Sequence, residues 1–202
     1  MDDDRPLVVK VGGSLLTWDG LKPALAGFLA SGELGGGNPV LIAGGGAFAD
    51  AVRLLDATHG LGEETSHRLA LRAMDVAARV LAALVVGSRV VEDVGDLADA
   101  WARDSIPILA PRRFLEEVDE RAPDPPPRSW ATTSDSIAAR VAAYVNADRL
   151  VLLKSATTPA RTRAEAATLG HVDPVFPTAC RGLDRVESID LRDPRRPTIR
   201  LD

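Results

Sequence analysis

Residues 7–14 read Leu-Val-Val-Lys-Val-Gly-Gly-Ser, a short apolar run that ends in a glycine turn. Residues 40–50 repeat the arrangement as Val-Leu-Ile-Ala-Gly-Gly-Gly-Ala-Phe-Ala-Asp. Apolar runs bounded by glycine indicate buried strands. Glycine lets backbone N–H groups approach an anion closely, and a helix that follows the turn adds the positive end of its dipole. Two such turns predict a protein that handles phosphate groups.

Apolar runs alternate with helical periodicity along most of the chain. Strands are predicted at 7–11, 39–43, 85–91, 106–109 and 149–154, and helices at 20–32, 47–58, 64–84, 94–103 and 134–146. This alternation is typical of βαβ units, so we expect an α/β fold, a three-layer αβα sandwich with a largely parallel central sheet. The weaker patterns at 185–190 and 197–201 predict edge strands. The proline-rich stretch 123–127 predicts an exposed excursion, because proline lacks an amide donor.

Composition narrows the class of protein. With 202 residues, 46% of them hydrophobic, the chain can form one domain with an ordinary core. A net charge of −5 argues against a nucleic-acid partner, which would require a basic surface. The single cysteine, Cys180, is expected to be buried. The acidic N-terminus and the short apolar runs predict a cytoplasmic protein with no membrane partner.

Two common nucleotide-binding motifs fit the sequence poorly. The pattern Gly44-x-Gly46-x-x-Ala49 matches the loose fingerprint of dinucleotide-binding proteins. That fingerprint also requires an acidic residue at the end of the next strand. The acidic residues at about the right distance, Glu63 and Glu64, instead begin a predicted helix. The P-loop pattern is absent from the sequence. Three histidines and one cysteine show no metal-ligand spacing, so no metal-binding residue is predicted.

A third block supplies further polar side chains. Residues 132–139 read Thr-Thr-Ser-Asp-Ser-Ile-Ala-Ala at the start of a predicted helix, and the next predicted strand ends at Lys154. Ligands of open α/β sheets lie at the carboxyl ends of the strands. We therefore expect Lys10, the two glycine turns and Lys154 to face one crevice that binds a small-molecule substrate.

The three blocks together resemble the amino acid kinase family, which includes acetylglutamate, aspartate, uridylate and isopentenyl phosphate kinases. The matching segments are 10–14, 44–50, 134–139 and 152–154, and the resemblance covers about residues 7–155. Shorter matches at 66–74, 133–139, 152–155 and 171–176 are most similar to the short branch of methanofuran-pathway (aminomethyl)furanyl-methyl phosphate kinases.

This resemblance implies an ATP-dependent kinase that transfers the γ-phosphoryl group to a small acceptor, with ATP and Mg²⁺ as cofactors and a homo-oligomeric state. Residues from about 1 to 130 are expected to bind the acceptor, and residues from about 131 to 202 the nucleotide. The branch further implies an acceptor that is itself a phosphate monoester, from methanofuran-like one-carbon cofactor biosynthesis. An isopentenyl phosphate kinase or a uridylate-type kinase is the alternative.

The resemblance also assigns roles to particular residues. Lys10 and Lys154 would neutralise the transferring phosphoryl group, with Asp135 orienting both lysines. Nucleotide phosphates are assigned to Gly12, Gly13, Ser14, Ser134 and Ser155, and the acceptor to Gly44, Gly45, Gly46, Asp50 and His67. Each of these residues could instead have a purely structural role. The glycines could form plain turns, Asp135 could cap the start of its helix, and His67 could simply lie at the start of a helix. His59 and His171 are expected in loops.

The chain departs from the family pattern after Ser155. Family members commonly continue into an Asp-Gly turn that shapes the nucleotide pocket, whereas residues 156–159 read Ala-Thr-Thr-Pro. The alternative of another class is therefore a non-catalytic ligand-binding or storage protein on the same fold. Retention of both lysines favours the kinase, because paired positive charges suit a phosphoryl group.

Overall fold

The computed structural model describes residues 5–35 and 37–202. One sheet contains strands β1 (Pro6–Val11), β2 (Asn38–Ala43), β3 (Ser88–Val91), β4 (Ile106–Leu109), β5 (Arg149–Lys154), β6 (Val186–Asp190) and β7 (Thr198–Arg200). The strand order is β3-β4-β2-β1-β5-β6-β7, and only the β6–β7 pairing is antiparallel. The prediction of a largely parallel sheet is confirmed, and one continuous sheet joins both parts of the chain.

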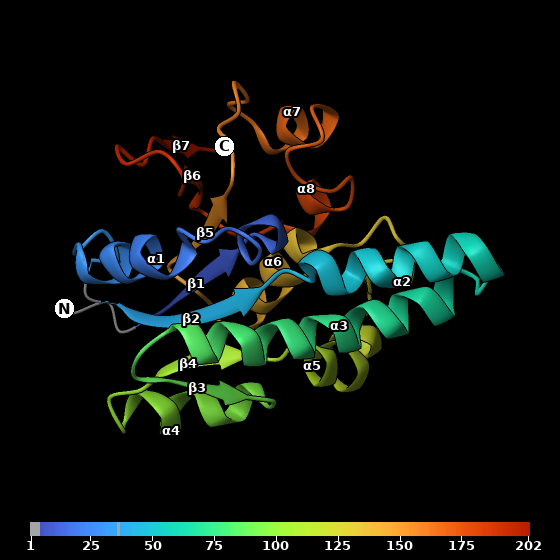
Figure 1. Cartoon of the computed structure of the whole chain (residues 1–202), viewed down its shortest axis with the longest axis horizontal. Helices are drawn as coiled ribbons and strands as arrows, with labels where there is room; N and C mark the ends of the chain where they lie inside the picture. The colour runs from blue at the N-terminus through green and yellow to red at the C-terminus, as the bar shows by residue number, and fades with distance from the viewer. Residues whose placement is uncertain (1–4, 36) are drawn as a thin grey trace.

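Helices cover both faces of this sheet. They are α1 (Leu21–Ala30), α2 (Gly46–His59), α3 (Glu63–Leu84), α4 (Leu97–Trp101), α5 (Arg112–Glu117), α6 (Ser134–Tyr144), α7 (Arg163–Thr168) and α8 (Phe176–Ala179). One hydrophobic core joins the sheet to α6 and to α4, α5, α7 and α8, and a second core joins the opposite face to α1 and the later part of α3. Figure 1 shows α2 and α3 as a long helical pair that extends past the strands.

The alternation of side chains along β1 and β5 determines where the two lysines point. Val8 and Leu152 belong to the core that contains α6, whereas Val9 and Leu153 belong to the core that contains α1. Side chains two residues apart in a strand share a face. Lys10 and Lys154 therefore both lie on the α6 face, at the carboxyl ends of neighbouring parallel strands.

Most predicted elements are present, with differences at their ends. The predicted strand 85–91 is wrong in its first three residues, because α3 is capped at Val85 and Gly87 turns the chain at φ 75°. The predicted helix 94–103 is a 3₁₀ turn, Val94–Asp96, followed by the short α4. The predicted helix 134–146 ends at Tyr144, because Asn146 adopts φ 50°.

The region after Lys154 holds more structure than its sequence pattern indicates. Both strands predicted there exist, but only β7 lies at an edge, because β6 pairs with β5 and β7. The short helices α5, α7 and α8 were not predicted. The stretch 123–127 contains neither helix nor strand, as expected. Within the described chain, no helix has both the length and the apolar content to cross a bilayer.

Candidate active site

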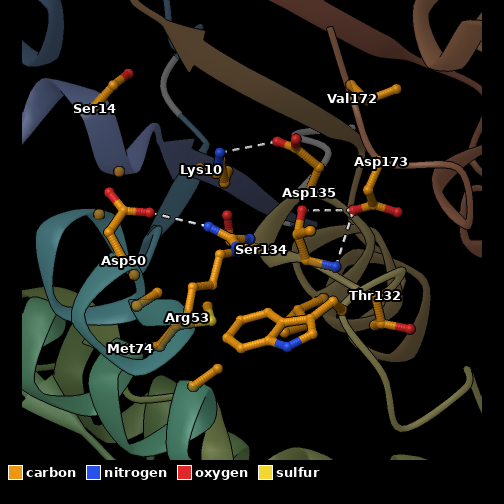
Figure 2. Close-up of a pocket in the computed structure, with 18 of the residues that line it drawn as sticks. Lys10, Ser14, Asp50, Arg53, Met74, Thr132, Ser134, Asp135, Val172 and Asp173 are labelled. Atoms are coloured by element: carbon orange, nitrogen blue, oxygen red, sulfur yellow. Dashed lines mark hydrogen bonds and ion pairs between the residues drawn. The ribbon is translucent and has the colours of Figure 1, made fainter. Parts of the chain in front are cut away.

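A cleft of about 660 Å³ opens at the carboxyl ends of β1, β2 and β5. Its walls come from the glycine turn after β1, the start of α2, the first half of α3, the segment 129–135, Lys154 and the loop 170–174. Figure 2 shows how these side chains converge from elements that are far apart in the sequence. The crevice expected from strand topology is therefore present.

One buried carboxylate holds both lysines in this cleft. The Nζ atom of Lys10 lies 2.9 Å from Oδ1 of Asp135, and the Nζ atom of Lys154 lies 2.7 Å from Oδ2. Asp135 lies in the first turn of α6, which places its carboxylate above the ends of β1 and β5. Two of the three lysines in the chain thus meet at one carboxylate.

The electrostatics of this triad hold Asp135 ionised. Burial tends to raise the pKa of Asp135, but the charges of Lys10 and Lys154 outweigh burial and lower this pKa to about 2. Burial and repulsion from Lys10 lower the pKa of Lys154 to about 8, against the attraction of Asp135. The triad therefore carries one net positive charge at neutral pH, in a site where water screens it weakly.

The loop 170–174 completes the triad from the other side. The carbonyl oxygen of His171 accepts a hydrogen bond of 2.7 Å from Nζ of Lys154, and Nε2 of His171 lies 2.8 Å from Oγ of Ser188. Asp173 is buried and accepts six hydrogen bonds, from Thr133, Ser136, Val175 and Phe176. This loop therefore fixes both Lys154 and the start of α6.

The two glycine turns pack directly against each other. A Cβ atom on Gly13 would lie 2.4 Å from the amide nitrogen of Gly46, and one on Gly46 would lie 2.5 Å from the carbonyl oxygen of Gly13. Gly46 also has φ +51°. A Cβ atom on Gly44 would lie 2.7 Å from the nitrogen of Gly13. Close backbone contact thus accounts for these glycines, whether or not an anion binds beside them.

Several backbone amides at these turns remain available to a ligand. Among the described residues, the amides of Gly13, Ser14, Gly45 and Gly46 have no hydrogen-bond acceptor. All four residues line the cleft. Free N–H groups at the start of helical turns are suited to binding phosphate oxygens. The packing of the turns and anion binding are therefore compatible.

The sequence-predicted site residues divide into those that line the cleft and those that support it. Lining residues are Lys10, Gly13, Ser14, Gly45, Gly46, Asp50, His67, Ser134, Asp135 and Lys154. The other three predicted residues, Gly12, Gly44 and Ser155, support this lining. The backbone amide of Gly12 donates a hydrogen bond to the carbonyl oxygen of Leu153, and the amide of Gly44 donates one to the carbonyl oxygen of Val11. The Oγ atom of Ser155 lies 2.9 Å from Oγ of Ser14. The structure brings all thirteen residues to one region, and their roles remain predictions.

The histidines and the cysteine differ in their surroundings. His67 is buried within α3 and lines the cleft, and burial lowers the pKa of its imidazole. His171 lies in a loop as expected, but it also lines the cleft, whereas His59 is the last residue of α2 rather than a loop residue. Cys180 is fully buried as predicted, and burial raises the pKa of its thiol to about 12.

The cleft residues that the sequence did not assign individually include Arg53, Trp130, His171 and Asp173. The segment 171–176 had been noted for its resemblance to one family branch, which was a usable signal for His171 and Asp173. Arg53 gave no such signal, because arginines are frequent on the solvent-exposed faces of this chain. Trp130 follows the proline-rich stretch, where periodicity gives no information.

Comparison with known proteins agrees with this geometry. The model of the amino acid kinase family matches residues 5–157. Over 145 residues, the chain is 30% identical to (5-(aminomethyl)furan-3-yl)methyl phosphate kinase from Methanocaldococcus jannaschii, an alignment that spans 72% of this chain and 63% of that protein. The matched part is thus less than two thirds of the relative's length.

Solved structures show the same fold at low sequence identity. UMP kinase from Ureaplasma parvum superposes with a TM-score of 0.71 and 13% identity, over 100% of this chain and 97% of that one. Aspartate kinase from Synechocystis superposes with a TM-score of 0.66 and 15% identity, over 98% of this chain and 40% of that one. The resemblance drawn from three sequence blocks is confirmed, and the chain belongs to the amino acid kinase family.

Proposed function

We propose that this protein is an ATP-dependent kinase that transfers the γ-phosphoryl group to a small phosphate monoester of the (aminomethyl)furanyl-methyl phosphate type. The observation that carries the proposal is the Lys10–Asp135–Lys154 triad, with its ammonium groups 2.9 and 2.7 Å from one carboxylate at the bottom of a cleft. Phosphoryl transfer requires positioning and charge neutralisation rather than a covalent intermediate. The triad and the free amides of the glycine turns provide both.

The chemistry of the triad indicates an acceptor that is already ionised. A hydroxyl acceptor requires a general base to remove its proton. Asp135 is unsuited to that task, because its pKa is about 2 and both lysines occupy its oxygens. A phosphate monoester has a second pKa of about 6, so at neutral pH it attacks without help from a base.

In the proposed reaction, an oxygen of the acceptor phosphate forms a bond to the γ-phosphorus of ATP. The bond between this phosphorus and the β–γ bridging oxygen breaks, and that oxygen leaves as part of ADP. Lys10 and Lys154 stabilise the negative charge on the transferring oxygens, while Asp135 holds the two ammonium groups at a fixed separation. The product is a diphosphate monoester, and no proton transfer is required.

The available side chains suit a magnesium ion that enters with the nucleotide. Across the described residues, no three His, Cys, Asp or Glu side chains are grouped to hold a metal. Asp135 is occupied by lysines, and Asp173 by amides and hydroxyls. Phosphate oxygens and water would therefore supply most ligands of Mg²⁺, as is common for this ion.

We further propose that the nucleotide lies on the β5 side of Lys10 and the acceptor on the β2 side, in line with the division near residue 130. The exposed segment Ala156-Thr157 lies outside the cleft lining, so the departure from the family pattern leaves the triad intact.

A homo-oligomer and a cytoplasmic location remain predictions. The exposed apolar side chains of Leu54, Leu55 and Val76 on the α2–α3 pair are suited to burial against a second copy.

The proposal is tested by incubating the purified protein with Mg-ATP and separate acceptors: (5-(aminomethyl)furan-3-yl)methyl phosphate, isopentenyl phosphate, UMP, acetylglutamate and aspartate. Products are identified by ³¹P NMR and mass spectrometry. We expect a diphosphate product from the furanyl-methyl phosphate, which is lost in Lys10→Ala and retained in Lys22→Ala, since Lys22 is exposed on α1. ATP binding without any product would instead support the non-catalytic alternative.

A further inference from the structure

Arg53 is a cation of the cleft to which neither the sequence pattern nor the triad assigns a role. Among the described residues that line the cleft, the lysine and arginine side chains are those of Lys10, Lys154 and Arg53. The two lysines are buried against Asp135, whereas the side chain of Arg53 is 48% exposed. Of these three basic side chains, Arg53 is therefore the most accessible to a ligand that enters the cleft.

The position of this guanidinium is set by an aromatic contact. Its Cζ atom lies 4.7 Å from the ring centroid of Trp130, within the range of a cation–π interaction. Nε1 of Trp130 donates a hydrogen bond of 2.8 Å to Oδ2 of Asp56, which fixes the indole to the helix that carries Arg53. We call Arg53, Trp130 and Asp56 the α2 clamp. The stacking orients the plane of the guanidinium.

Most donors of the Arg53 guanidinium are open to an anion. Nη1 of Arg53 donates to Oδ1 of Asp50 at 3.0 Å, and the side chain of Asp50 is 70% exposed. An exposed ion pair of this kind contributes little stability, about 0–1 kcal/mol. Guanidinium has five N–H donors in a planar fork that matches two phosphate oxygens. A phosphate can therefore bind Arg53 beside Asp50 or in its place.

Topology puts the α2 clamp across Lys10 from Lys154. Strand β1 lies between β2 and β5, and α2 begins at the turn that follows β2. Lys154 ends β5 on the other side of β1. Figure 2 shows Arg53 and Asp50 on one wall of the cleft and Asp135 on another. A ligand held by Arg53 thus approaches the triad from the side opposite the nucleotide phosphates.

We propose that Arg53, oriented by Trp130, binds the phosphate group of the acceptor and makes the cleft selective for phosphate monoesters over the corresponding alcohols. The assignment to the acceptor rests on the proposed kinase function, whereas phosphate binding by the α2 clamp does not. A cation is needed there because the acceptor dianion must approach a second phosphate group, and the triad supplies only one net positive charge. Arg53 supplies another on the acceptor side.

The test is calorimetric titration of the full chain with benzyl phosphate, an aromatic methyl phosphate, and with benzyl alcohol. We expect benzyl phosphate to bind and benzyl alcohol to bind at least tenfold more weakly. Arg53→Ala should weaken benzyl phosphate binding at least tenfold, with Arg53→Lys intermediate because it keeps the charge without the fork. Trp130→Leu should weaken it severalfold. The control Arg79→Ala, which removes an exposed arginine on α3 paired with Glu92, should leave it unchanged.

A titration with Mg²⁺ and a non-hydrolysable ATP analogue separates the two sides of the cleft. We expect Arg53→Ala to bind this analogue within twofold of the wild type. Weaker analogue binding with unchanged benzyl phosphate binding would overturn the acceptor assignment. No binding of benzyl phosphate by the wild type, or equal binding by Arg53→Ala and the wild type, would overturn the α2 clamp itself.

Turnover distinguishes this inference from the proposed function. If the wild type shows no phosphoryl transfer but binds benzyl phosphate through Arg53, the kinase proposal fails and the anion site stands. If the wild type is active and Arg53→Ala keeps the same KM for the acceptor, the inference fails and the kinase proposal stands. Circular dichroism verifies that each variant is folded. We expect this for Arg53→Ala because Arg53 is an exposed residue of α2 and alanine is the best helix former.

Discussion

The carboxylate of Asp173 accepts hydrogen bonds from both the amide and the hydroxyl of Ser136, a residue 37 positions earlier in the chain. The same carboxylate binds the amide and hydroxyl of Thr133, at the N-cap of α6. The loop that follows α7 thus caps the helix that carries Asp135. The position of the Asp135 carboxylate therefore depends on a contact between residues 37 to 40 positions apart in the chain.

Asp173→Asn should therefore lower both stability and activity. Asparagine keeps the shape but loses the charge and one acceptor oxygen, so buried donors lose their partner at a cost of about 1–3 kcal/mol. Urea unfolding measures this loss. As a control, Asp99→Ala, which removes an exposed α4 residue paired with Arg103, should change stability by less than about 0.5 kcal/mol. At a temperature where the Asp173 variant is fully folded, turnover should still be reduced. Full turnover there would limit Asp173 to a structural role.

The lowered pKa of Lys154 predicts a pH limit on activity. Only the protonated amine neutralises phosphate charge, and the pKa of this group is about 8. As the pH rises through 8, Lys154 loses its proton and kcat/KM, which reports groups of the free enzyme, should fall. Lys154→Arg should move this decline above pH 10, because arginine stays charged. Lys22→Arg should leave it in place, and a wild-type profile that is flat up to pH 10 would refute the assignment.

Two glycines at the ends of α2, the first residue Gly46 and the C-cap Gly60, allow the cost of backbone strain to be measured separately from that of close packing. Both Gly46 and Gly60 have positive φ, +51° and +63°, but only Gly46 has backbone atoms where a Cβ would be, whereas Gly60 has none within 4 Å. Gly60→Ala should cost about 1–2 kcal/mol, the strain of the left-handed conformation. Gly46→Ala should cost clearly more, because the turn after β1 must move. Chemical denaturation measures both losses, and equal losses would contradict the packing of the two turns.

Much of the fold follows from local sequence pattern. The buried strands β1, β2 and β5 are continuous apolar runs that end in glycine or lysine, so their existence and their shared edge were predictable. Elements whose stability comes mainly from tertiary packing were missed, such as α8, which has four residues and starts with Phe-Pro. The helix α7 carried a readable signal, because Thr162 and Glu165 form a capping box.

The site residues at the ends of strands could be predicted from the sequence, whereas those positioned by contacts between distant segments could not. Lys10 and Lys154 were expected together because parallel strands place their carboxyl ends at one edge, whereas Asp135 was assigned to them by the family resemblance. Asp173 caps a helix 37 residues away, and Trp130 meets α2 from an irregular segment. Local periodicity carries no information about either contact. The glycine turns were read as anion sites, and their contact with each other came only from three-dimensional packing.

The central claim is that Lys10 stabilises the phosphoryl group during transfer, and the turnover of Lys10→Ala tests it most directly. The measurement is the rate of diphosphate formation from Mg-ATP and (5-(aminomethyl)furan-3-yl)methyl phosphate, followed by ³¹P NMR, with wild type and Lys22→Ala as references. Loss of one preorganised charge predicts a kcat lower by about 100-fold or more, with KM for ATP changed far less. Lys22→Ala should match the wild type. A folded Lys10→Ala variant with wild-type kcat would contradict the claim.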